Sequence, residues 1–371
     1  MLNRFLLLLL VACLLTATGC GTVQIENRAF VTAIGLDIST GQDAQYIVTI
    51  EVYRPGMLRS RLEDSPSILQ TVEAETFEVA MEQLQARLSR IITLSHLRLL
   101  VIGEEAAKEI DLREIIDYFE RHPEVQMRIK TMAVQDGQAL DLLKVEPLFE
   151  ESVTEELVEL TQKADYLPLT NMNPFFMFAQ ELRITGGRGL LPRVIATEDG
   201  NLAILHGGAV FNHYKLAGWL SSKEVHDANW ILGGIQRTAE DAELDGNNYS
   251  YSIRRSRTKI IPRVEQEELR FTVKVETEGI LRQQQGNQLD LSDPGNIARL
   301  EDSVSSAIAR NAQTAVDKSQ QDLGIDYLGF STVLKRHNRR YYEQIRWEET
   351  YPSVPIDIEV DAKIALTGKT W

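Results

Sequence analysis

The chain has 371 residues, of which 43% are hydrophobic and 25% are charged, a composition typical of a folded globular protein. Its net charge is −15, and the only charge within residues 1–19 is that of Arg4. This acidic balance argues against a phosphate-binding surface for DNA, RNA or anionic lipid. The residues after position 19 are enough for two or three domains of about 100–200 residues each.

The first twenty residues have the features of a secretory leader. A basic start precedes an apolar run over residues 5–15, a length that suits a signal peptide. This run is shorter than a membrane-spanning helix, which needs about 20 apolar residues. The segment Thr18-Gly19-Cys20 resembles the bacterial lipobox, whose cysteine is joined to diacylglycerol and becomes the first mature residue. The resemblance implies that Cys13 is discarded with residues 1–19 and that Cys20 carries the lipid. An uncleaved anchor and a plain signal peptide are the alternatives.

After Cys20 no apolar run approaches spanning length, so we expect a soluble body outside the membrane. Two acyl chains on Cys20 would satisfy the two-signal requirement for stable anchoring.

Residues 27–135 predict the order β-β-α-β-α-β. Alternation favours strands, and apolar residues at spacings of three and four favour helices. The predicted elements are strands at 30–37, 46–52 and 97–102, a helix carrying Phe77, Met81, Leu84, Leu88 and Ile91, a helix carrying Ile110, Ile115, Ile116 and Phe119, and a half-exposed strand at 125–131.

The middle of the chain is less regular. Asn173-Pro174 predicts the start of an apolar helix, and Asp199-Gly200 predicts a tight hairpin turn between two short strands. The organisation changes near residue 200, where we place the domain boundary. We therefore expect a signal peptide at 1–19, an N-terminal region at 20–200 with a further break near 135–145, and a C-terminal domain at 201–371.

The C-terminal part has the clearest patterns. Residues 269–276 and 356–364 alternate as strands, one long helix spans 294–323 and stops at Gly324, and a shorter helix covers 328–336. Alternation predicts a sheet that is covered on one face only. The fold class is therefore α+β, with several domains and mixed, mostly antiparallel sheets, each packed against amphipathic helices.

Residues 207–234 read GGAVFNHYKLAGWLSSKEVHDANWILGG, which predicts two strands and a helix that begins with a Ser221–Glu224 capping box and ends at Gly233-Gly234. This block resembles the C-terminal domain of the Ger(x)C family, the lipoprotein C subunits of bacterial spore germinant receptors. Other blocks resemble the family in the same order, at 27–39, 95–109, 257–279, 326–342 and 351–368. Gly21-Thr22 departs from the aromatic-acidic pair that many members carry after the cysteine.

The resemblance implies a non-catalytic, lipid-anchored subunit of a nutrient receptor that helps to trigger spore germination. It implies membrane-embedded A and B receptor subunits as partners, and the bilayer itself through acylated Cys20. The implied location is the spore inner membrane, with the globular part outside the cytoplasm. We expect no nucleic-acid partner, no cofactor and no catalytic residue.

Several acidic and histidine residues are candidates for chemistry. Asp241-x-Glu243-x-Asp245-Gly246 resembles a calcium loop, but Ser252 stands where the bidentate glutamate belongs, which favours a solvated acidic turn. The six histidines have no ligand spacing. Three carboxylates alternate with aliphatic residues, which favours a solvated sheet face: Asp357, Glu359 and Asp361.

Trp219 and Trp230 are candidates for a partner interface, because tryptophan is enriched among interface hot spots, although both equally fit a core. Three functions compete: a non-catalytic receptor subunit, a lipid-anchored extracellular solute-binding protein that captures a small molecule between two lobes, and a surface hydrolase. The hydrolase lacks a nucleophile with its base and acid. A two-lobed binder would show buried parallel strands, whereas the clearest strands here alternate.

Overall fold

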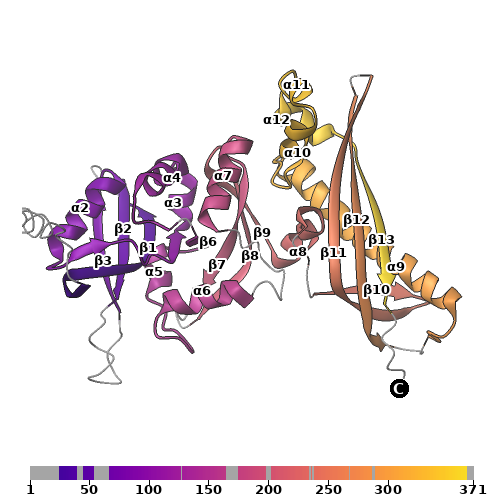
Figure 1. Cartoon of the computed structure of the whole chain (residues 1–371), viewed down its shortest axis with the longest axis horizontal. Coiled ribbons are helices and arrows are strands. Elements are labelled where there is room, and N and C mark those ends of the chain that lie inside the picture. Colours follow the sequence, from indigo (N-terminus) through magenta and orange to yellow (C-terminus); the bar gives the residue numbers. More distant parts are fainter. Residues whose placement is uncertain are drawn as a thin grey trace, which may run out of the picture.

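A computed structural model describes residues 25–39, 45–53, 67–126, 128–163, 174–197, 202–233, 235, 238–266, 268–285 and 289–365. The chain forms two β-sheets that lie side by side, each with its own helices (Figure 1). Cys20 and the rest of the leader lie outside the described residues. Within the described part of the chain, no helix is long and apolar enough to cross a bilayer.

The first sheet has antiparallel strands at both ends and parallel strands at its centre. A short strand, β4 (Ile91–Thr93), pairs in parallel with the first residues of β1. In order across the sheet the other strands are β3 (Ser67–Ala74), β2 (Tyr46–Tyr53), β1 (Arg28–Ile38), β5 (Leu99–Ile102), β6 (Lys130–Val134), β7 (Gly189–Ala196), β8 (Ala203–Asn212) and β9 (Lys215–Leu220).

Helices cover both faces of this sheet. One apolar cluster joins alternate residues of β1 and β5 to α2 (Phe77–Arg87), α3 (Glu104–Glu109), α4 (Leu112–Arg121) and α7 (Phe175–Thr185). A second cluster joins the intervening residues to α5 (Ala139–Leu143) and α6 (Val153–Lys163) on the opposite face (Figure 1). The four residues Leu-Leu-Val-Ile of β5 are buried without interruption because both of their faces are covered.

Three predictions for the N-terminal half are wrong. The helix expected to carry Phe77 to Ile91 ends at Arg87, since Leu88 is already extended and Ile91 begins strand β4. The helix expected to carry Ile110 to Phe119 is two helices, because Asp111 caps the second one by accepting the backbone N–H of Arg113. The strand expected at 125–131 begins only at Lys130, and β6 is a buried parallel strand rather than a half-exposed one. Met127 lies outside the described residues.

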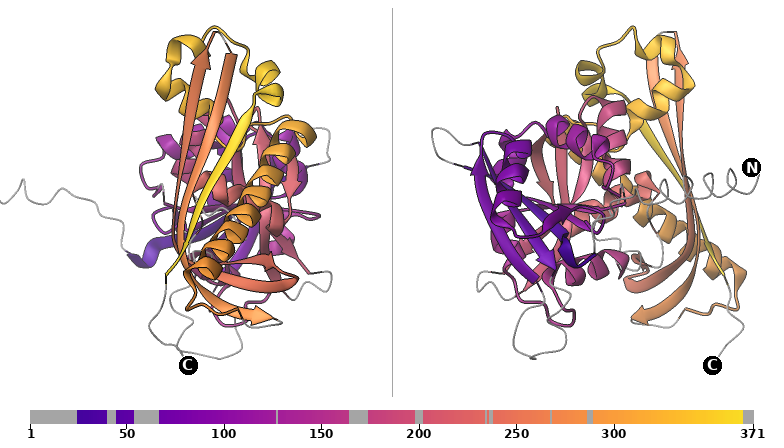
Figure 2. Two further views of the ribbon diagram at one scale, coloured as in Figure 1. Left: turned by 90° about the vertical axis from the view of Figure 1, so that its right-hand side faces the viewer. Right: turned by 60° about the vertical axis from the view of Figure 1, so that its left-hand side comes forward.

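The second sheet has the order β10 (Ala239–Leu244), β11 (Asn247–Glu265), β12 (Glu268–Gln285) and β13 (Ile356–Ile364). The first two pairs are antiparallel and the last is parallel. Helix α9 (Pro294–Asp317) runs across one face and continues as a π-helical turn, η4 (Lys318–Asp322) (Figure 2). The other face carries exposed charged side chains, as the alternation predicted.

Small helices complete the C-terminal part. They are α8 (Ser222–Leu232), α10 (Phe330–His337), α11 (Arg339–Tyr342), α12 (Trp347–Thr350) and the 3₁₀ turn η5 (Tyr351–Ser353). Another 3₁₀ turn, η1 (Ile25–Asn27), lies directly before β1 in the N-terminal half. The capping box of Ser221 and Glu224 is present, and Gly233 ends α8 in the left-handed conformation as predicted. The predicted long helix, α9, and the predicted strand at 356–364, β13, are also confirmed.

The α+β fold class is confirmed, and the position of the domain boundary stays a prediction. Strand β8 pairs with β7 and β9 pairs with β8, so the first sheet continues to Leu220, past the expected boundary at residue 200. The expected hairpin is present, with Ala196 opposite Ala203, while its turn residues Asp199-Gly200 lie outside the described residues.

Candidate functional site at the junction of the two sheets

The two tryptophans have different environments. Trp230 of α8 is fully buried, and its indole N–H donates to Glu240 Oε2 at 3.2 Å. It therefore offers no surface to a partner, and its place in the core is what its large apolar ring favours. Trp219 of β9 is half-buried and its indole N–H donates to Glu104 Oε1 at 3.4 Å. Of the two tryptophans, we therefore keep only Trp219 as a proposed partner contact.

A pocket lies at the carboxyl ends of the parallel strands β1, β5 and β6. It has a volume of about 430 Å³ and is lined by Asp37, Glu104, Lys108, Asp136 and neighbours. The Asp37 carboxylate accepts the backbone N–H groups that begin α5, at 2.7 and 3.0 Å. Burial nevertheless raises the pKa of Asp37, because desolvation outweighs these hydrogen bonds.

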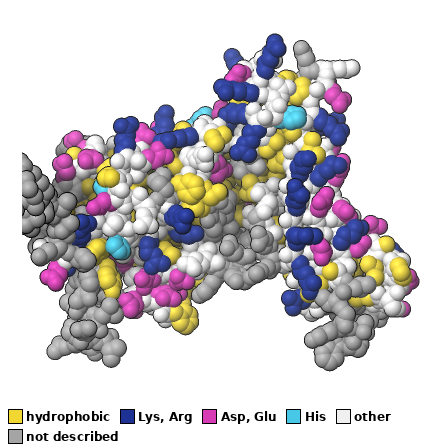
Figure 3. Space-filling view, in the orientation of Figure 1, with side chains coloured by type: hydrophobic (Ala, Val, Ile, Leu, Met, Phe, Trp, Pro, Cys, Tyr) yellow, Lys and Arg dark blue, Asp and Glu magenta, His cyan; other side chains and the backbone are white. Residues whose placement is uncertain are grey.

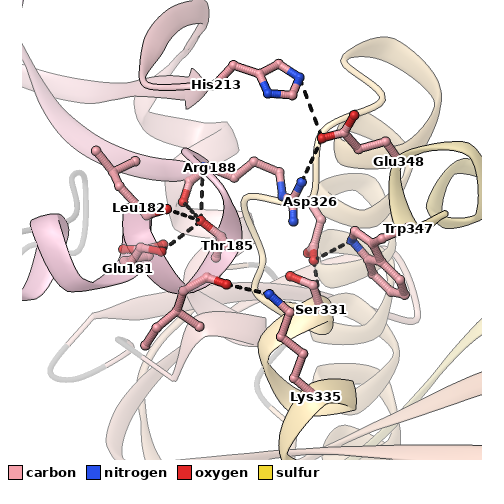
Figure 4. Close-up of polar contacts among 11 residues, drawn as sticks. Glu181, Leu182, Thr185, Arg188, His213, Asp326, Ser331, Lys335, Trp347 and Glu348 are labelled. Carbon is pink, nitrogen blue, oxygen red and sulfur yellow. Dashed lines mark hydrogen bonds and ion pairs between the residues drawn. The ribbon is translucent and has the colours of Figure 1, made fainter. Parts of the chain in front are cut away.

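The first half of the junction is the turn after α7. Gly186 and Gly187 have φ angles of 79° and 97°, and a Cβ on Gly187 would lie 2.4 Å from the backbone nitrogen of Tyr214. Only glycine fits this close approach. The turn brings Arg188 towards the C-terminal part, where its guanidinium lies 3.0 Å from Glu348 Oε1 (Figure 4). The side chain of Arg188 is 5% exposed, so this ion pair is largely shielded from solvent on the arginine side.

The second half of the junction is organised by Asp326. Its carboxylate accepts the three backbone N–H groups of Gly329, Phe330 and Ser331, at 2.9, 2.9 and 2.6 Å. It also accepts the indole N–H of Trp347 at 3.1 Å. One carboxylate therefore fixes the start of α10 and the start of α12 against each other.

Two more contacts connect the halves. Lys335 of α10 donates from Nζ to the backbone oxygen of Ile184 at 2.5 Å, near the end of α7 (Figure 4). His213, in the turn between β8 and β9, lies 3.6 Å from Glu348. The residues joined here are separated by about 135 to 160 positions in the sequence, so the two sheets are connected through side chains as well as through the chain.

The electrostatics of the junction centre on Glu181 of α7. Burial, and then the negative charge of Asp326, raise the pKa of the Glu181 carboxyl to about 8. A cavity of about 60 Å³ at the junction is lined by Arg188, Asn212, Trp347 and neighbours. That volume is enough for about two water molecules. Arg188 Nε and Asn212 Oδ1 have no hydrogen-bond partner among the described residues, and both groups could be satisfied by such waters.

The other candidate groups form no reactive arrangement in the part of the chain that the structure describes. No three His, Cys, Asp or Glu side chains there are placed to hold a metal ion. Asp245 lies in the turn between β10 and β11 and pairs with Arg299 at 2.7 Å. Asp357 and Glu359 pair with basic residues of β12, as expected for a solvated sheet face.

Comparisons with known proteins match both halves of the chain. Residues 206–368 match the family "Spore germination B3/GerAC like, C-terminal", and residues 21–196 match "Spore germination protein N-terminal domain". The chain belongs to the Ger(x)C family. This membership gives the chain a role in spore germination.

Individual relatives agree with the Ger(x)C assignment. Spore germination protein B3 of Bacillus subtilis is 24% identical over 96% of both chains. Spore germination protein KC of the same species is 22% identical over 93% of this chain and 91% of its own. The crystal structure of the GerBC protein superposes with a TM-score of 0.60 at 20% identity, over 90% of this chain and 97% of that one, and shows the same fold.

Sequence reasoning missed the residues that join the two sheets of this Ger(x)C chain. Asp326 gives no standard capping signal, because it lies three residues before Gly329, the residue that directly precedes α10. The pairing of Arg188 with Glu348 has no local signal, since the two residues are 160 positions apart. Only the fold brings them together.

Proposed function

We propose that the chain is a non-catalytic, lipid-anchored subunit of a spore germinant receptor. The observation that carries the proposal is the match of two successive spore germination families across residues 21–196 and 206–368. The proposed partners are membrane-embedded A and B subunits of the receptor.

The proposed anchor is the lipid on Cys20. Only a few residues separate Cys20 from the first described turn at Ile25–Asn27, so a lipid there would hold the body close to the membrane surface. Metabolic labelling with a clickable fatty acid should mark the wild-type chain and leave Cys20→Ala unlabelled. Equal labelling of the two would refute the anchor.

The proposed mechanism is assembly. Tethering to the membrane raises the effective concentration of the body near membrane partners, so that individually weak contacts suffice. The junction of Arg188, Asp326 and Glu348 would keep the two sheets in a fixed relative position, so that surfaces on both can be presented to partners at once.

The experiment that tests this function is germination of a deletion strain on a panel of nutrients. Loss of the nutrient response with normal germination by non-nutrient triggers is the expected result. Because an indirect loss is possible, a strain carrying Cys20→Ala serves as the matched comparison and should show a weaker defect of the same kind. An unchanged nutrient response in the deletion strain would contradict the proposal.

A second candidate function is capture of a small molecule by a lipid-anchored solute-binding protein. Two observations favour it: β5 and β6 are buried parallel strands, contrary to the sequence argument against such a protein, and a pocket of about 430 Å³ lies at their carboxyl ends. A thermal-shift screen of the wild-type chain and of Asp136→Lys, which fills the rim of this pocket, would test it. Stabilisation of the wild type alone by one nutrient would favour capture.

A further inference from the structure

Like charges face each other on the open face of the second sheet. In the ladder of β11 and β12, Lys259 lies directly opposite Lys274 and Arg263 lies directly opposite Arg270. Such pairs destabilise an antiparallel ladder. Carboxylates of β13 neutralise the two β12 residues, at 2.7 Å for Lys274 and 3.0 Å for Arg270. Lys259 and Arg263 have no carboxylate at ion-pair distance among the residues that the structure describes.

A second group of basic residues lies at the tip formed by α10 and α11. Residues 335–346 contain five Lys or Arg residues and one acidic residue. Arg339 pairs with Glu343 in the next turn, but both side chains are mostly exposed, and such pairs contribute little. Arg336 and Arg340 are exposed and form no ion pair within the described ranges.

The two groups are continuous on the surface. Helix α10 contacts β11, and residues 254–263 of β11 contain five Lys or Arg residues and no acidic one. Figure 3 shows Lys and Arg side chains running from the tip down the margin of the second sheet. We call this surface the basic ridge and define it by Lys259, Arg263, Arg336, Arg339 and Arg340. An overall charge of −15 therefore does not exclude a local anion-binding surface.

The fold holds the tip of the basic ridge in place. The Asn338 side chain caps α11 by accepting the backbone N–H of Tyr341 at 3.1 Å. Lys335 is used internally, since it donates to Ile184 and lies 4.6 Å from the ring centroid of Tyr342. The neighbouring arginines are thus presented from an ordered backbone, which lowers the entropic cost of binding.

We propose that the basic ridge binds an acidic segment of a partner protein, an inference that rests on the proposed function as a receptor subunit. Four of its five residues are arginines, whose planar guanidinium groups bind carboxylates bidentately and are enriched at protein interfaces. None of the exposed large hydrophobic side chains of the described structure lies within α10, α11 or β11, whereas surface binding to a bilayer draws on buried apolar area. Lys259 and Arg263 lie about 13 Å apart along the strand, the spacing of every fourth residue in an extended chain.

The test is binding of a fluorescein-labelled peptide of twelve alternating glutamates and serines to the full chain in detergent, measured by fluorescence anisotropy. We expect the ridge variant Lys259→Gln/Arg263→Gln/Arg336→Gln to bind about tenfold more weakly than the wild type. Replacing Arg336 and Arg340 by lysine keeps the charge and should cause a smaller loss, because bidentate binding alone is removed.

The matched control removes the same charge from exposed arginines elsewhere, Arg90→Gln/Arg121→Gln/Arg282→Gln, and should change binding less than about twofold. Equal losses in the two triple variants, or equal binding of a glutamine-serine peptide, would overturn the proposal. Binding of phosphatidylglycerol vesicles through the ridge without binding of the peptide would also overturn it in favour of lipid. The measurement uses no receptor subunit, so its failure would leave the germination test of the proposed function intact.

Discussion

Replacing Glu181 with glutamine should change how the stability of the protein depends on pH. The carboxyl of Glu181 lies at the junction of the two sheets, where burial and the charge of Asp326 raise its pKa from 4.5 to about 8. The folded protein therefore keeps this group protonated at pH values at which the unfolded chain has released the proton. Glutamine has nearly the same shape as the protonated acid and does not titrate.

The sign and size follow from proton linkage. Between pH 4.5 and 8 the folded state binds more protons at Glu181 than the unfolded state, so the free energy of unfolding falls as pH rises. The contribution is fully present below pH 4.5 and is lost as pH rises through 8. A single titrating group can change the free energy of unfolding by at most about 1.4 kcal/mol per pH unit. Glu181 keeps part of its surface in contact with solvent, so we expect the free energy of unfolding to fall by about 1–2 kcal/mol between pH 5.5 and 7.5, less than this limit allows.

The assay is urea unfolding of the wild type and Glu181→Gln at pH 5.5, 6.5, 7.5 and 8.5, followed by tryptophan fluorescence. Relative to the wild type, Glu181→Gln should gain stability steadily as the pH rises from 5.5, and its advantage should be largest at pH 8.5. Its stability should therefore fall less steeply with pH. Parallel pH profiles of the two proteins would refute the reasoning, because they would mean that Glu181 titrates alike in the folded and unfolded states.

Five further substitutions test the junction and the pocket. Arg188→Ala should destabilise the protein by about 2–4 kcal/mol in urea unfolding, and Glu348→Gln by a comparable amount, because it leaves the buried Arg188 guanidinium without its counter-charge. Asp326→Ala should cost about 2–4 kcal/mol, since it leaves three N–H groups and the Trp347 indole without their acceptor, and thermal unfolding of Asp326→Asn should show a smaller loss. Gly103→Ala should lower the melting temperature, because the new Cβ would lie 2.0 Å from an Asp37 oxygen.

The parts of the fold with strong local signals were predictable. Ser221 and Glu224 define the start of α8, and the alternation of residues 356–364 defines β13 to the residue. Strand β11 was missed because its pattern shifts at a bulge between Ile253 and Arg255. Odd-numbered residues are buried before the bulge and exposed after it, so no single alternation runs through the strand.

Local sequence patterns could not predict which strands and side chains are buried, or which distant residues pair. The segment before Lys130 alternates like a half-exposed strand, yet β6 is central because helices α5 and α7 cover both of its faces. Trp230 and Trp219 look alike in sequence, but only the packing of α8 against the second sheet buries the first. The net charge of −15 likewise did not indicate the local charge of individual surfaces, since the basic ridge lies on this acidic chain.

The central claim is that this chain is an assembled subunit of a germinant receptor. The most direct measurement is co-purification from detergent-solubilised spore membranes in which the A and B subunits carry affinity tags. The account predicts that the wild-type chain is recovered with both tagged subunits, and that Cys20→Ala is recovered in lower amount. Failure of the wild-type chain to co-purify, together with an unchanged nutrient response after its deletion, would contradict the account.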